Sequence, residues 1–167
     1  SPSHAALSSL QQIDVSTFEK MRDVERYQIK IAEKHFLSGN FKVALAEYEK
    51  FLTLYEKSPG APYAQLMWSH TMMELKKPKT ALRDGFQSVI DYWPKSHEAT
   101  TAAYCMGDAY RTMGEVKEAQ KAFRFLITEY PDHEIAIRSR QDLLHYARLH
   151  QDMEERLSLL NELTFKV

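Results

Sequence analysis

Seven histidines and one cysteine are the residues with which this chain could bind a metal or attack a substrate. A helical zinc site places two histidines four residues apart on one face. No histidine pair has that spacing, and His145 and His150 are five residues apart, on different faces. Cys105 is the single cysteine, so a disulfide framework and a multi-cysteine zinc site are excluded. The sequence predicts no metal site and a buried, apolar role for Cys105.

The carboxylates give no sign of an acid–base pair, because they alternate with basic residues, as Glu47 and Glu49 do with Lys50. Such a pattern is typical of a solvated helix face. Neither GxxxxGK[ST] nor GxGxxG, the common phosphate-binding loops, occurs. We therefore expect no catalytic residues, no bound cofactor and no enzyme activity. A helical enzyme without a recognisable motif is a minor alternative.

Composition indicates which elements carry these side chains. Among 167 residues there are only 5 Gly and 6 Pro. Strong helix formers make up about half of the chain, which favours long helices over a many-stranded sheet. Lys and Arg number 22 against 23 Asp and Glu, so no bulk charge attracts nucleic acid or anionic lipid. No apolar run approaches the ~20 residues of a membrane span. We expect an all-α protein.

A repeat of about 37 residues organises the chain. Tyr55, Tyr92 and Tyr130 are 37 and 38 residues apart, and each is followed within four residues by a proline. Three further columns align at the same offset: Ala44, Ala81 and Ala119; Leu52, Val89 and Ile127; and Tyr48, Gly85 and Phe123, where Phe86 can take the place of the missing aromatic side chain. Helical apolar spacing within each unit predicts two helices per unit. The expected helices are 17–38, 41–57, 62–76, 78–93, 97–113, 116–130, 133–149 and 153–165.

We therefore expect an N-terminal tail, 1–16, without sustained periodicity, and one repeat domain, 17–167. The domain divides into units of about 17–59, 60–95, 96–132 and 133–167. The last unit departs from the pattern, because Arg156 occupies the small-residue position and Val167 the tyrosine position. Terminal repeats are commonly atypical, since one side has no neighbouring unit.

These residues resemble the tetratricopeptide repeat (TPR) family. The third unit matches the family's small, aromatic, turn-glycine, alanine, aromatic and proline positions with Gly107, Tyr110, Gly114, Ala119, Phe123 and Pro131. The resemblance implies a right-handed superhelix of about four helical hairpins. Residues 92–114 also resemble a subset found in bacterial envelope proteins, such as the Tol-Pal-associated cell-division coordinator and the outer-membrane β-barrel assembly lipoprotein.

The resemblance further implies that the first helix of each hairpin lines a concave groove, where a protein or peptide partner binds. The implied groove residues are Arg26, Glu33, Phe36, Tyr63, Leu66, His70, Tyr104, Asp108, Arg111, Arg138, Gln141, His145 and Arg148. The groove would be apolar in the first two units and basic in the last two. It suits a segment with hydrophobic anchors and an acidic stretch or a terminal carboxylate. An ordinary solvated helical face is the alternative interpretation.

We expect a non-enzymatic scaffold that binds a protein partner, with no nucleic acid bound and no direct membrane span. The narrower resemblance suggests a periplasmic or envelope-associated domain that acts in envelope assembly or division, with a cytoplasmic protein as the alternative. The alternative function is structural self-association, in which the end hairpins or the groove pair with another copy to form a homo-oligomer.

Overall fold

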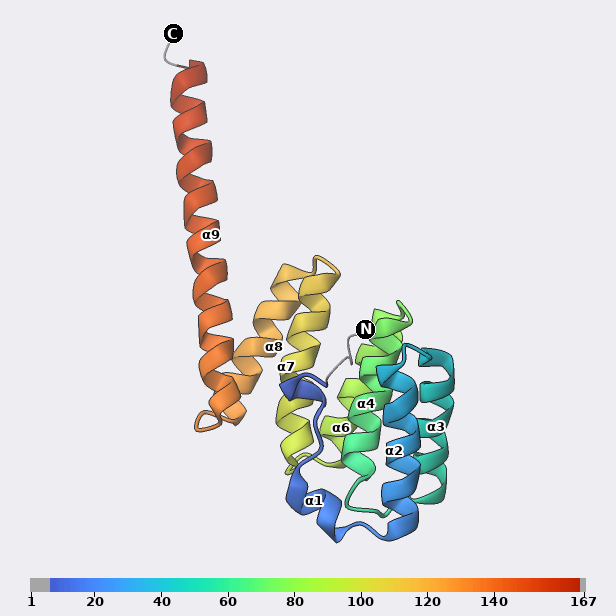
Figure 1. The fold of residues 1–167 in the computed structure, drawn as a ribbon. Coiled ribbons are helices and arrows are strands. Elements are labelled where there is room, and N and C mark those ends of the chain that lie inside the picture. The colour runs from blue at the N-terminus through green and yellow to red at the C-terminus, as the bar shows by residue number, and fades with distance from the viewer. Residues whose placement is uncertain (1–6, 166–167) are drawn as a thin grey trace, which may run out of the picture.

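A computed structural model describes residues 7–165. Helix α2 (Asp23–Leu37) pairs with α3 (Phe41–Leu54) in the first hairpin, and α7 (His97–Thr112) pairs with α8 (Val116–Glu129) in the third. The second hairpin joins α4 (Ala61–Glu74) to three consecutive segments, namely α5 (Pro78–Thr80), the π-helical η2 (Ala81–Phe86) and α6 (Gln87–Tyr92). Helix α9 (Glu134–Phe165) packs on α8 and then extends away from the other helices (Figure 1). The expected all-α helical repeat fold is confirmed.

The buried side chains form three hydrophobic clusters. The first contains Tyr48, the second Phe86 and the third Phe123. Tyr48 and Phe123 are fully buried, as their alignment predicts. Phe86 is also buried and fills the position that Gly85 leaves empty. A π-helix bonds residue i to residue i+5, so five residues complete about one turn. Phe86, five residues after Ala81, therefore faces the core as Tyr48 does four residues after Ala44.

The three hairpins turn in the same way. Gly39 and Gly114 have φ values of +76° and +78°, and Lys76 has a φ of 61°. The next residue in each turn donates its backbone N–H to a carbonyl five residues earlier, as Lys77 does to Met72 at 3.0 Å. This left-handed C-terminal turn favours glycine. Lys76 lies 37 residues after Gly39 and 38 before Gly114, so it occupies the turn position that glycine fills in the other units.

Two predicted helix boundaries are wrong. The helix expected at 17–38 is interrupted at Met21, which has an extended backbone and separates α1 (Val15–Lys20) from α2. The last two helices, expected at 133–149 and 153–165, form the single helix α9. Asp152 followed three residues later by Glu155 resembles a helix start, and on that pattern the sequence predicts a turn between 149 and 153. An Asp is compatible with a helix interior, and neither Gly nor Pro ends the helix between 149 and 153. The fourth unit is therefore a long helix instead of a hairpin.

The expected tail, 1–16, is not structureless in its described part. Residues 7–13 include a short 3₁₀ turn, η1 (Ser9–Gln11), and α1 begins at Val15. Residues 1–6 of the expected tail, and 166–167 of the expected last unit, lie outside the described residues. Among the helices described, none is long and apolar enough to cross a membrane.

Candidate protein-interaction surface

Helices α2, α4 and α7 are the first helices of the three hairpins, and residues 7–13 of the same chain lie against them (Figure 1). We call these residues the N-terminal segment. Leu10 packs against both the second and the third hydrophobic cluster, and Leu7 and Ile13 pack against the first. The three side chains are spaced three residues apart, so one side of the segment faces the helices. The groove implied by the sequence is therefore occupied by the chain itself in its first two units and at the edge of the third.

Tyr63 connects this segment to the buried carboxylate of Glu33. The Tyr63 hydroxyl oxygen lies 2.8 Å from Glu33 Oε1 and 2.8 Å from the Gln11 carbonyl oxygen. A hydroxyl donates one hydrogen, so it bonds to one of these acceptors at a time. Glu33 also accepts from Lys30 Nζ at 3.2 Å. Burial and the Glu33 charge raise the pKa of Tyr63 above its ordinary range, which keeps the hydroxyl protonated as a donor.

His70 holds the neighbouring carbonyl of the segment. Its Nε2 lies 3.1 Å from the Leu10 carbonyl oxygen, and its ring packs edge-on against Phe86 at 5.4 Å between centroids. Burial lowers the pKa of His70 to about 4, although the Leu10 carbonyl and Asp108 both favour the charged form. At neutral pH the imidazole is therefore uncharged, with the Nε2 hydrogen available to Leu10.

This burial predicts a pH-dependent stability. Between the ordinary value of 6.5 and about 4, the unfolded chain binds a proton at residue 70 that the folded chain does not. We therefore expect acidification through this range to lower the free energy of unfolding, by at most about 1.4 kcal/mol per pH unit from this group. His70→Gln is the control, because its amide still donates to Leu10 but does not titrate. Urea unfolding from pH 7 to 4 should show a steeper loss for the native chain, and parallel curves would contradict the prediction.

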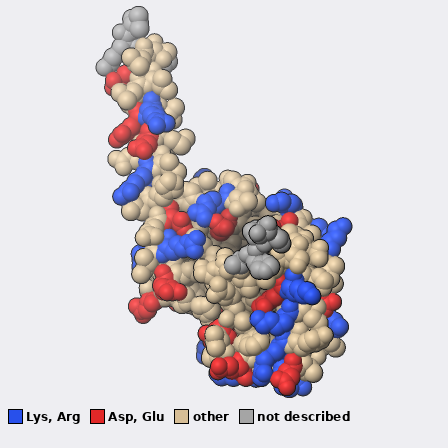
Figure 2. Space-filling model, viewed as in Figure 1, with Lys and Arg blue, Asp and Glu red and all other residues tan. Residues whose placement is uncertain are grey.

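Of the three arginines expected to make the last two units of the groove basic, Arg111 is paired with carboxylates. Arg111 forms ion pairs with Asp108 and with Asp142, the latter at 3.1 Å. The Tyr104 hydroxyl donates to Asp142 at 2.9 Å, and the Arg138 guanidinium lies over the Tyr104 ring, 4.7 Å from its centroid. Figure 2 shows basic and acidic side chains interspersed on this face of the molecule. Asp142, which the sequence reasoning missed, therefore joins α7 to α9.

The remaining groove residues are divided between structural and exposed positions. Arg26 donates to the Phe18 carbonyl at 3.1 Å and so caps α1. Phe36 and Leu66 are buried in the first and second clusters. Besides Arg111 of α7, the exposed members lie on α9, and they are Arg138, Gln141, His145 and Arg148. Their role in binding a partner stays a prediction.

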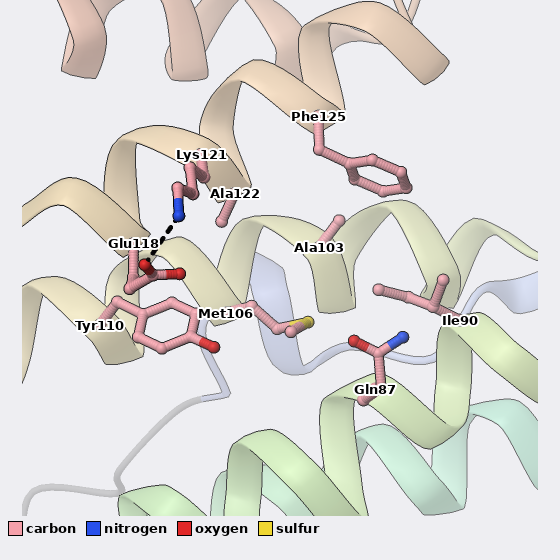
Figure 3. Close-up of a pocket in the computed structure, with 9 residues that line it drawn as sticks. All are labelled: Gln87, Ile90, Ala103, Met106, Tyr110, Glu118, Lys121, Ala122 and Phe125. Carbon is pink, nitrogen blue, oxygen red and sulfur yellow. Dashed lines mark hydrogen bonds and ion pairs between the residues drawn. The ribbon is translucent and has the colours of Figure 1, made fainter. Parts of the chain in front are cut away.

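A second surface feature is a pocket among α6, α7 and α8 (Figure 3). Ile90, Met106 and Phe125 supply much of its apolar lining. Its two charged lining residues, Glu118 and Lys121, pair with each other at 3.0 Å. The pocket therefore presents no free acid or base to a substrate. Across residues 7–165, no three His, Cys, Asp or Glu side chains gather as a metal site would require.

A helical repeat whose concave face holds a short peptide segment defines a class of protein-binding modules. Comparison with known families agrees, because residues 102–133 match the model of the tetratricopeptide repeat. The match covers the third hairpin, the unit with the most complete set of motif residues. Tetratricopeptide repeats generally mediate protein–protein interaction and are typically non-enzymatic. No curated protein matches the chain.

Proposed function

We propose that this protein is a non-enzymatic scaffold that binds, on its concave face, a short segment of a partner protein with apolar side chains at three-residue intervals. One observation carries the proposal: the face already holds such a segment, residues 7–13, from its own chain. Tyr63 and His70 are positioned to donate to the backbone carbonyls of Gln11 and Leu10. Bonds to backbone atoms recognise a peptide segment whatever its side chains are, so a partner segment can use the same two donors.

The side chains on this face also indicate which kind of partner segment would fit it. Leu7, Leu10 and Ile13 show that apolar side chains at three-residue intervals fit the hydrophobic clusters. Arg138 and Arg148 are exposed on α9, beyond the occupied part of the face. A partner with apolar anchors followed by an acidic stretch would complement both parts.

The proposed contact between α9 and an acidic stretch of the partner has its own test. Once crosslinking in the native host has identified the partner, we expect Arg138→Glu combined with Arg148→Glu to weaken its affinity at least tenfold, because two attractive charges become repulsive. Arg140→Glu combined with Lys95→Glu is the matched control, since both residues are exposed and neither belongs to the groove set. Isothermal titration at two salt concentrations measures the effect. Equal affinities for the two double variants would refute the role of α9 in binding.

We further propose that the protein acts at the bacterial cell envelope, in assembly or division. This part rests on the resemblance of residues 92–114 to repeats of envelope proteins, and in particular on the Tyr-Pro joints between units. Two of these joints contact each other, because the Tyr130 hydroxyl of one donates to the Pro94 carbonyl of the other at 3.1 Å. Fractionation of the native host with an antibody to the chain tests the location. Recovery from the periplasm or membranes agrees with the proposal, and recovery from the cytoplasm alone would exclude it.

A further inference from the structure

Helix α9 carries an apolar stripe that continues past its contact with α8. Leu143 and Tyr146 pack against the third cluster in the first half of the helix. Every residue described from 147 to 164 is exposed. The stripe nevertheless continues at helical spacing through Leu149, Met153, Leu157, Leu160 and Leu163. The projecting part of α9 stands clear of the other helices in the space-filling view (Figure 2).

A groove between α8 and α9 begins where this contact ends. Val116 and Gln120 of α8 line one side, and Leu143, Tyr146, Leu149 and Met153 of α9 line the other. In the other three units, the second helix of the hairpin packs against its own first helix. The sequence predicts such a helix at 153–165, but the chain continues straight through 149–153. The groove therefore lies where the second helix of the fourth hairpin would pack.

We propose that a second copy of this chain fills the groove, with its residues 153–165 lying antiparallel to residues 134–149 of the first copy. Each copy then supplies the helix that the other lacks, and the same surface is used twice about a two-fold axis near His150. This arrangement is a domain swap. When the turn of a hairpin straightens, the second helix can make with another copy the same contacts that it would make within its own chain. The groove lies away from the N-terminal segment, and neither Arg138 nor Arg148 lines it, so the proposal does not depend on the proposed function.

Charge supports a second copy as the occupant. Lys117 and Arg124 of α8 are basic residues at the groove. Residues 152–165 contain four acidic residues, Asp152, Glu154, Glu155 and Glu162, against the single basic Arg156. The acidic half of α9 is therefore complementary to the basic edge of the groove in another copy. The antiparallel arrangement also continues an apolar contact that α8 and α9 already make.

Sedimentation equilibrium of the full chain over a wide range of concentrations tests the proposal. Leu157 and Leu160 are each 59% exposed, so replacing both with Glu leaves the core of a single copy unchanged. We expect a dimer for the native chain and at least tenfold weaker association for Leu157→Glu/Leu160→Glu. Leu159→Glu is the matched control, because Leu159 is 60% exposed and lies off the stripe. A monomeric native chain, or equal weakening by Leu159→Glu, would overturn the proposal.

Cysteine crosslinking tests the orientation. A residue at a two-fold axis faces its own counterpart, so His150→Cys should form a disulfide-linked dimer under mild oxidation. At about 1.5 Å per residue, the two copies of residue 158 would lie about 24 Å apart, so Ser158→Cys should not crosslink. Cys105 is buried and does not interfere. Crosslinking at Ser158 without crosslinking at His150 would overturn the antiparallel arrangement, and the reverse pattern supports it.

Discussion

Gly107→Ala will lower the free energy of unfolding by about 2 kcal/mol, although alanine is the better helix former by about 1 kcal/mol. A Cβ atom at residue 107 would lie 2.7 Å from Cζ and 2.8 Å from Cδ1 of Phe123. The Phe123 ring is fully buried and packs on Tyr104, so it has no room to withdraw. Because α7 and α8 cross at this point, the added methyl group separates the two helices of the repeat.

A double-mutant cycle isolates this clash from the change in helix propensity. In the Phe123→Leu background the smaller side chain leaves space, so we expect Gly107→Ala to be neutral or stabilising there. Urea denaturation of the four proteins supplies the coupling energy. If Gly107→Ala has the same effect in both backgrounds, close packing against Phe123 is not the reason for glycine at this position.

Leu10→Asp will release the N-terminal segment from the concave face. Leu10 contacts two hydrophobic clusters, and a carboxylate in that position would lose its hydration without gaining a partner. We expect the docked state to be weakened by about 2 kcal/mol, a shift of roughly thirtyfold in the docked population. Amide hydrogen exchange of residues 7–13 should then approach the rate of an unstructured peptide.

Ser9→Asp is the control for this substitution. It adds the same charge to the same 3₁₀ turn, but Ser9 is exposed. Its exchange rates should remain those of the native chain. Equal acceleration in the two variants would mean that charge in the turn, and not loss of the Leu10 contact, controls docking.

The periodic columns of the sequence predicted the hairpins well, because their residues meet in the core at each repeat. Gly107 was identified differently, because the resemblance to the tetratricopeptide repeat family places a small residue at that position. Lys76 was not recognised as a turn residue, since the pattern was sought as glycine and the left-handed backbone can hold another residue at some cost in energy. The turn in the last unit was predicted from a capping pattern that a continuous helix also tolerates.

The docking of the N-terminal segment was missed for a different reason. Residues 7–13 are too short for a helical or strand period to be evident, and their hydrogen bonds are made by backbone carbonyls, which every sequence possesses. The one available signal was the three-residue spacing of Leu7, Leu10 and Ile13. Such long-range contacts depend on how the helices assemble and leave no local pattern in the sequence. The groove residues could therefore be named from the sequence, but the segment that occupies the groove could not.

The central claim is that the concave face binds a short segment whose apolar side chains are spaced three residues apart. It is tested most directly by adding a fluorescent peptide with the sequence of residues 7–13 to the full-length chain. Fluorescence anisotropy should show saturable binding to Leu10→Asp, whose own segment is displaced, and at least tenfold weaker binding to the native chain and to Ser9→Asp, where the face is occupied. Absence of binding to all three proteins, or equal binding to all three, would contradict the claim.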